Sequence, residues 1–330
     1  MGTKFRKSDR VRKSEQLIIN RLKDKSQALA KRSIKFSDDI DISIENKRLN
    51  IHIASKGENF PVAQNMQTDG AAFEGWAICL KSWLADEINT VHLTWDKPEV
   101  HNDHYNRFLY RVWRFNGMYN WFEYDDEAGE VEKFKTCFAG SRNNSGNKEP
   151  NRKEKDCEEQ VEHYMVEQNQ TIFTSRFNIE KINRHLPVGV KDKNGKSLFT
   201  GRNSAIDLWG IGVDSILHLF ELKYIKEQEG SKNIKVGIIS ELLLYVNIIN
   251  DIRKGIIGTP LNAILPAEKA LYNRITELKG VKGLFLTNEL HPLLENREEL
   301  LKILNANGEN ISFAFANYRW DAQQHRVSFE

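Results

Sequence analysis

The sequence has few cysteines and no long apolar run, and each absence excludes a class of protein. Its three cysteines, Cys79, Cys137 and Cys157, lie far apart and form no CxxC pair. This spacing argues against a disulfide framework and a zinc cluster, and it favours a reducing compartment. No apolar run reaches the roughly 18 residues of a membrane span, and no apolar signal segment follows the basic N-terminal residues. We therefore expect a cytoplasmic protein without a membrane partner.

Common catalytic motifs are missing as well. The glycines of GRNSAIDLWGIGVDS belong neither to a P-loop with its lysine nor to a GxGxxG that opens a helix. No GxSxG motif and no cysteine paired with a histidine as a nucleophile stands out. No internal repeat of fixed period is visible either. Charged side chains on apolar elements are therefore the remaining candidates for functional residues.

The length of the chain and its uneven charge distribution indicate more than one structural part. The chain of 330 residues exceeds the usual size of one domain, so we expect two domains or one domain with a large extension. The net charge is only +2, yet residues 1–33 carry eleven Lys or Arg against three acids. We interpret residues 1–34 as a basic arm, which is either a solvated, partly helical tail or an arm that reaches nucleic acid.

Residues 35–138 are predicted to form a small α/β domain of unknown task. IDISIENKRLNIHIAS alternates on both sides of a turn and predicts a hairpin. A helix within 70–88, a strand over 90–95 and a helix with extended chain over 104–124 follow. The tryptophans of this stretch indicate core packing, with a base-stacking platform as the alternative: Trp76, Trp83, Trp95, Trp113 and Trp121.

Residues 139–160 are polar, rich in Gly, Asn, Ser, Lys and Glu, and are predicted to be a linker. Residues 161–330 then predict a second α/β domain. Its expected elements are a helix over 174–186, strands over 205–213 and 216–224, a helix over 236–255, a strand over 281–288, a helix over 293–305 and a strand over 311–320. The long helix after the strand pair is suited to cover a sheet.

Three charged side chains interrupt the apolar strands of this second domain. In ILHLFELKY, strand geometry places Glu221 and Lys223 on the same face. In AIDLWG, Asp207 alternates with Ile206 and Leu208, so it also lies on one face of an apolar strand. The turn GIGVDS allows a hairpin that brings the two carboxylates together. Converging carboxylates need a cation to offset their repulsion, and hard oxygen ligands favour Mg²⁺ or Mn²⁺. Beside that cation, Lys223 would orient a water and stabilise charge on a phosphate.

This pattern resembles the PD-(D/E)XK nuclease superfamily of restriction, repair and phage-defence enzymes. The resemblance spans residues 172–318 and implies a restriction-endonuclease-like core of helix, three strands, helix and strand. It implies that Asp207, Glu221 and the Leu222 carbonyl bind the metal and that Lys223 handles the attacking water. It further implies that Glu180 supports the site from the first helix, with Glu241 as an accessory group on the second. The proline of the family name is replaced by Ile206.

The resulting hypothesis is a Mg²⁺- or Mn²⁺-dependent nuclease that hydrolyses nucleic acid, with DNA favoured and a role in restriction or phage defence. A homodimer, or a protein partner bound through the N-terminal domain, is also open. One alternative is a non-catalytic nucleic-acid-binding or scaffold protein on a degenerate nuclease fold. Another is an enzyme that processes small nucleotides.

Other polar patterns have simpler interpretations. Two further Glu-x-Lys triplets, at 45–47 and 277–279, are interpreted as a hairpin turn and a helix end. HNDH at 101–104 is interpreted as a loop that caps the following helix, with a metal site as the alternative. His218 is expected in the core, and His291, before Pro292, in a turn.

Overall fold

A computed structural model describes residues 7–54, 60–66, 68–143, 157–199, 205–225, 235–260 and 266–330. The chain forms two compact units that are interleaved in sequence. Unit 1 comprises Met1–Lys135, Lys235–Ser240 and His291–Gly308. Unit 2 comprises Thr136–Ile234, Glu241–Leu290 and Glu309–Glu330. The sequence led us to expect consecutive domains instead, and residues 144–156 of the expected linker lie outside the described residues.

Unit 1 contains a four-stranded sheet in the order β1-β2-β3-β4. Its strands are β1 (Ile40–Glu45), β2 (Arg48–Ile53), β3 (Thr90–Trp95) and β4 (Phe122–Tyr124). The first two form the expected hairpin, and its turn residues Asn46 and Lys47 have φ values of 51° and 62°. Such left-handed conformations match the twist of a two-residue hairpin. From β2 to β4 the strands are parallel, so their carboxyl ends share one edge of the sheet.

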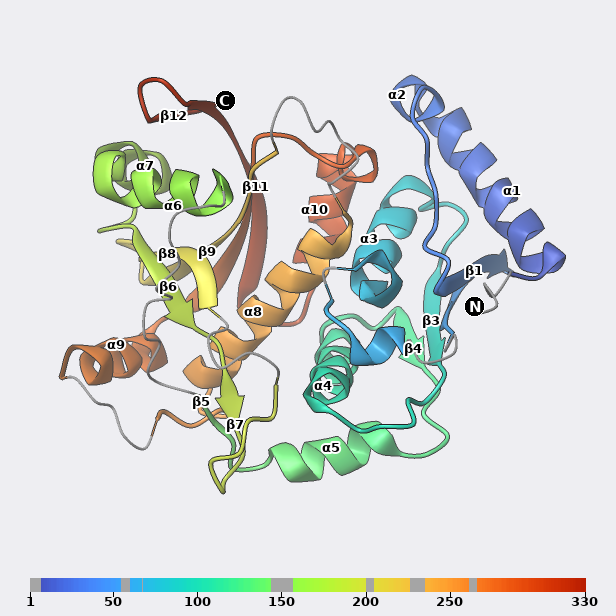
Figure 1. The fold of residues 1–330 in the computed structure, drawn as a ribbon, viewed down its shortest axis with the longest axis horizontal. Coiled ribbons are helices and arrows are strands. Elements are labelled where there is room, and N and C mark those ends of the chain that lie inside the picture. Colours follow the sequence, from blue (N-terminus) through green and yellow to red (C-terminus); the bar gives the residue numbers. More distant parts are fainter. Residues whose placement is uncertain are drawn as a thin grey trace, which may run out of the picture. The chain divides into compact units, whose positions relative to one another are not determined.

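Helices cover both faces of this sheet, as Figure 1 shows for α3, α4 and α1. The helices and 3₁₀ turns of unit 1 are α1 (Asp9–Lys25), α2 (Gln27–Ala30), η1 (Pro61–Ala63), η2 (Asp69–Ala71), α3 (Phe73–Trp83), α4 (Asp103–Met118), α5 (Glu130–Phe138), whose end from Thr136 on belongs to unit 2, η4 (Pro292–Leu294) and α10 (Arg297–Asn305). In α1, Ile18 and Leu22 are fully buried. The described part of the expected basic arm therefore contains two helices of unit 1, and the apolar stripe of α1 contributes to the core.

Unit 2 contains a six-stranded sheet in the order β12-β11-β10-β9-β8-β6. Its strands are β6 (Asn183–Pro187), β8 (Ala205–Ile211), β9 (Ile216–Lys223), β10 (Gly280–Thr287), β11 (Ile311–Asp321) and β12 (Arg326–Phe329). The first three form an antiparallel meander, and β10 and β11 run parallel to β9. A separate pair joins β5 (Arg142–Asn143) to β7 (Val190–Lys191).

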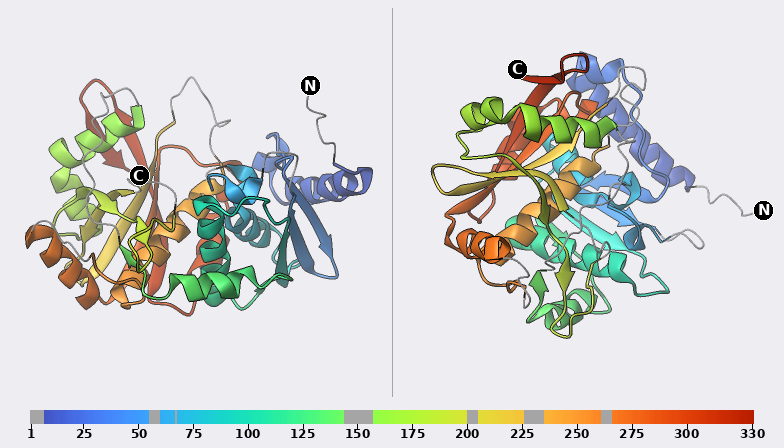
Figure 2. Two further views of the ribbon diagram at one scale, coloured as in Figure 1. Left: turned by 60° about the horizontal axis from the view of Figure 1, so that its bottom comes forward. Right: turned by 60° about the vertical axis from the view of Figure 1, so that its left-hand side comes forward.

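Helices also pack on both faces of the large sheet, and Figure 2 shows the strands between the helical layers. The helices of unit 2 are α6 (Cys157–Gln168), α7 (Gln170–Phe177), α8 (Gly237–Arg253), whose first turn belongs to unit 1, and α9 (Pro266–Glu277). Met165 and Phe173 from α6 and α7 share one apolar cluster with Leu208, Phe220 and Leu222 of the sheet. The expected mixed α/β class is confirmed.

The helix expected over 174–186 does not form as predicted. Helix α7 ends at Phe177, where Asn178 adopts a left-handed φ of 52°, and residues 183–187 form β6 instead. Asparagine tolerates this conformation and commonly terminates helices. The neighbouring strand β8 then offers β6 its main-chain hydrogen bonds. No helix in the described ranges is both long enough and apolar enough to cross a membrane.

Candidate active site

Asp207 and Glu221 lie where strands β8 and β9 end their pairing. The antiparallel ladder runs from Ile211–Leu217 to Leu208–Phe220, and the next two residues along are Asp207 and Glu221. Beyond the ladder, the Leu222 main-chain N–H donates to Asp207 Oδ2 at 2.9 Å. The strand register therefore places both carboxyl groups at the same end of the sheet.

Lys223 lies at the centre of a group of carboxylates from three elements. Its Nζ is 2.6 Å from Glu221 Oε1 on β9, 3.5 Å from Glu241 Oε2 on α8 and 3.8 Å from Glu158 Oε1 on α6. The Lys223 side chain is 27% exposed, whereas that of Glu221 is 2% exposed. The Lys223 side chain is thus partly accessible from solvent, while the carboxylate beside it is enclosed.

Burial and mutual repulsion strongly perturb the acids. Burial raises the pKa of Asp207 to about 7, although the charge of Lys223 opposes the rise. Burial and the neighbouring Glu241 raise the pKa of Glu221 well above its usual range. For Lys223, burial disfavours the charged form, but the surrounding carboxylates outweigh it and raise the pKa well above its usual value. The lysine is therefore charged, and the acids compete for its charge and for protons.

Helices α8 and α6 supply site residues that the sequence analysis missed. The Tyr245 hydroxyl donates to Glu241 Oε1 at 3.2 Å, one helical turn further along α8. Glu158 Oε2 accepts a hydrogen bond from the Tyr224 N–H at 3.0 Å, which holds α6 at the end of β9. The spacing of four residues between Glu241 and Tyr245 was a readable signal, because such pairs meet on a helix. Glu158 had no such signal, since it lies in the segment expected to be a linker.

A second charged group lies beside Asp207. Glu162 on α6 accepts from Arg184 Nε at 2.8 Å and lies 3.1 Å from His185 Nε2. His185 has a φ of 56° and interrupts the β6–β8 ladder opposite Asp207. The hydrogen bond to Glu162 raises the pKa of His185, against the effect of burial. Arg184 and His185 were not predicted as site residues, because residues 174–186 were expected to form a helix.

The structure brings Asp207, Glu221, Lys223 and Glu241 together but places Glu180 elsewhere. Glu180 follows the end of α7, and its carboxylate forms an ion pair with Arg274. Its N–H donates to the Ile211 carbonyl at 2.9 Å, four residues along β8 from Asp207. Four strand residues span roughly 13 Å. On α6, Glu158 Oε1 lies 3.8 Å from Lys223 Nζ, and the charge of Glu162 acts on Asp207.

The site's donors suit a hard cation, although they do not form an all-carboxylate cage. Within the described part of the chain, no three His, Cys, Asp or Glu side chains form a group that could hold a metal ion. Asp207 and Glu221 supply two carboxylates, and the buried Oε2 of Glu221 has no hydrogen-bond donor among the described residues. Because the N–H and C=O of one strand residue point to the same side, the Leu222 carbonyl faces β8 together with its N–H. Oxygen donors of this kind fit Mg²⁺ or Mn²⁺.

The other polar patterns have structural roles. Asn102 of HNDH caps α4 by accepting from the N–H groups of His104 and Tyr105, both at 3.0 Å. His218 is 5% exposed, and burial lowers its pKa to about 4. His291 caps η4 by accepting from the Leu293 N–H at 3.2 Å. In unit 1, Trp76 is 1% exposed and lies in the core.

Comparisons of the chain with protein family models, with curated proteins and with solved structures found no match. The candidate active site combines a charged lysine with enclosed acids from a strand pair and two helices. Such a group can bind a divalent cation, position a water and stabilise negative charge.

Proposed function

We propose that the chain is a Mg²⁺- or Mn²⁺-dependent nuclease that hydrolyses phosphodiester bonds of nucleic acid, with DNA favoured. The observation that carries this proposal is Lys223 Nζ within 4 Å of Glu221 and Glu241, next to Asp207 at the end of the β8–β9 pairing. The order of helix, three antiparallel strands, helix and parallel strand in unit 2 supports a restriction-endonuclease-like core.

Each site residue has a role that follows from its chemistry. Asp207, Glu221 and the Leu222 carbonyl would hold the cation, which when bound lowers the pKa of a water and offsets phosphate charge. Lys223 orients the attacking water and stabilises the charge that develops on the phosphate. Glu241, held by Tyr245, keeps the ammonium of Lys223 over the strand end. Without a cation, the cluster of carboxylates repels a phosphate, so binding and cleavage both depend on the metal.

A cleavage assay with matched lysine variants tests the proposal. The chain contains Glu-Leu-Lys twice, at 221–223 in the site and at 277–279 at the end of α9, where Lys279 is exposed. With Mg²⁺ or Mn²⁺, we expect Lys223→Ala to lose roughly 10²- to 10⁴-fold of the cleavage rate and Lys279→Ala to lose none. Asp207→Asn and added EDTA should abolish cleavage. The substrates are plasmid, single-stranded DNA, RNA and small nucleotides.

Two results would contradict the proposal. One is the absence of metal-dependent cleavage of every polymer by the folded protein; nucleic-acid binding that persists in EDTA would then favour the scaffold alternative. The other is equal loss in the Lys223 and Lys279 variants. A second readout is thermal: Mn²⁺ should raise the unfolding midpoint of the native chain but not that of Asp207→Asn. Restriction or phage defence is the biological setting that we propose for this activity.

A further inference from the structure

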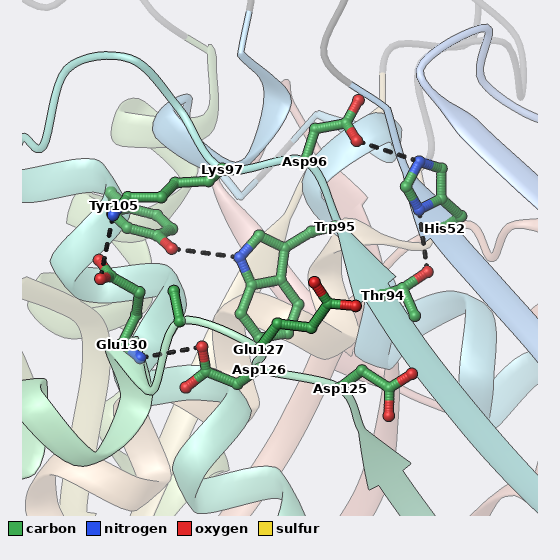
Figure 3. Close-up of a pocket in the computed structure, with 11 residues that line it drawn as sticks. His52, Thr94, Trp95, Asp96, Lys97, Tyr105, Asp125, Asp126, Glu127 and Glu130 are labelled. Carbon is green, nitrogen blue, oxygen red and sulfur yellow. Dashed lines mark hydrogen bonds and ion pairs between the residues drawn. The ribbon is translucent and has the colours of Figure 1, made fainter.

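Unit 1 contains a pocket whose lining includes none of the residues assigned to the candidate active site. Its volume is about 600 Å³, and Figure 3 shows the residues that line it. It lies at the carboxyl ends of the parallel strands: His52 precedes the end of β2, Trp95 ends β3, and Asp125 follows β4. In open α/β sheets, ligands bind in the crevice at this edge. The volume is also within the range of roughly 300–1,000 Å³ of ligand sites.

The aromatic wall of the pocket is held in one orientation. Trp95 Nε1 donates to the Tyr105 hydroxyl at 3.2 Å. The indole also packs against Phe108, edge to face at a centroid distance of 5.2 Å, and against Tyr124 at 6.3 Å. These contacts leave the indole little freedom to rotate. Figure 3 shows it in the middle of the lining residues, between Asp96 and the acids after β4.

The pocket is strongly acidic. Among the described residues that line it are one lysine and five acids: Asp96, Asp125, Asp126, Glu127 and Glu130. Lys97 is bonded to Glu130 at 3.0 Å, so its charge is already compensated. Burial, together with the charges of Glu130 and Asp126, raises the pKa of Tyr105 to about 12. The negative field therefore extends to the aromatic wall.

Three of the other acids that line the pocket also have partners of their own. His52 Nε2 lies 3.5 Å from Asp96, and His92 Nε2 lies 3.1 Å from Asp125. Asp126 caps α5 by accepting from the N–H groups of Glu130 and Val131 at 2.9 Å and 2.7 Å. The carboxylates are thus spread around the pocket, and within the described residues no three of them converge on a metal position.

We propose that this pocket binds an organic polycation of the aliphatic polyamine class. A chain of separated ammonium groups matches separated carboxylates, and an ammonium over the indole face gains a cation–π interaction. A single metal ion does not match the spread of the acids, and nucleic-acid phosphates are repelled by them. Unit 1 would then sense or store a cationic small molecule, independently of the site in unit 2.

Calorimetric titration of the full chain with spermidine at fixed ionic strength tests this proposal. We expect saturable binding that Glu127→Gln and Asp96→Asn each weaken by about threefold to tenfold, the effect of one nearby charge at a partly solvated site. Glu99→Gln is the matched control, because Glu99 is exposed in the same unit and does not line the pocket.

Three results would overturn it: no saturable heat with spermidine or putrescine, equal weakening by Glu99→Gln, or full displacement by magnesium chloride at matched charge concentration. Each would mean that the acids act only as a general charged surface. Glu127 is exposed and its replacement leaves the core intact, so the test remains valid if Asp96→Asn does not fold.

Discussion

Lys223 is the residue on which the charge balance of the candidate site depends. Burying a carboxylate such as Glu221 costs several kcal/mol unless a partner compensates it. Lys223 supplies that partner through the 2.6 Å contact and reaches Glu241 at 3.5 Å. Loss of the lysine would leave these acids to bind protons or a metal. Under the proposed function, a bound cation would provide part of this compensation.

His218 gives a prediction for the pH dependence of stability. Burial, and then the charge of Lys282, lowers its pKa from 6.5 to about 4 in the folded chain. Between these values the unfolded chain binds a proton that the folded chain does not. Stability should therefore fall as the pH falls from about 6.5 towards 4, by about 2 to 3 kcal/mol from this residue.

Urea unfolding at pH 7 and pH 4.5 measures this effect. The loss of stability between the two pH values should be about 2 kcal/mol smaller in His218→Leu than in the native chain. His101→Gln, at an exposed histidine of unit 1, should retain the full loss. An identical pH dependence in His218→Leu and the native chain would refute the assignment.

At the scale of elements, close packing decides where a helix tolerates a side chain. Gly75 in α3 and Gly117 in α4 are both helical, but their surroundings differ. A Cβ on Gly75 would collide with the Val236 carbonyl, whereas a Cβ on Gly117 would meet nothing within 4 Å. The same substitution should therefore have opposite effects in the two helices.

Alanine substitutions at these two glycines test the packing of unit 1. Gly75→Ala should lower the free energy of unfolding by about 2 to 3 kcal/mol, because α3 or the segment at Val236 must move. Gly117→Ala should raise it by about 0.5 kcal/mol through helix propensity. Urea unfolding measures both, and a stabilising Gly75→Ala would show that the close contact is absent.

The elements also differ in whether the local sequence pattern predicts them. Strands β9, β10 and β11 were predicted because their apolar runs are long and bounded by turns. Strand β6 was missed, since NRHLP is short and polar and becomes a strand only beside β8. Helix α6 was not predicted, because its sequence is rich in charged residues and few of its positions, such as Val161 and Met165, are apolar and buried. Tertiary contacts therefore determine that β6 forms a strand and α6 a helix.

At the scale of the whole molecule, unit 1 is completed by a late segment of the chain. The Tyr119 hydroxyl donates to the Leu304 carbonyl at 2.9 Å, and Asn296 Nδ2 donates to the Ser82 carbonyl at 2.8 Å. Leu300 and Leu304 of α10 are fully buried. An N-terminal fragment would leave the facing surfaces of α3 and α4 exposed to water.

We therefore expect a fragment of residues 1–138 to lack a cooperative unfolding transition and to bind the dye ANS. The same fragment joined through a Gly-Ser linker to residues 289–308 should regain the transition, because α10 again covers the core. Urea unfolding, monitored by tryptophan fluorescence, distinguishes the two fragments. A cooperative transition in the short fragment would show that α10 is dispensable.

The sequence by itself determined the mixed α/β class, the long strands and the placement of Glu221 and Lys223 on one strand face, because alternation along a strand is a local property. It also located Asp207 and Glu241 on their elements. Only the tertiary structure decided that Glu158 rather than Glu180 lies beside Lys223, and that α10 belongs to unit 1. The reason is physical: which elements meet depends on surfaces distant in sequence, and no local periodicity encodes that choice.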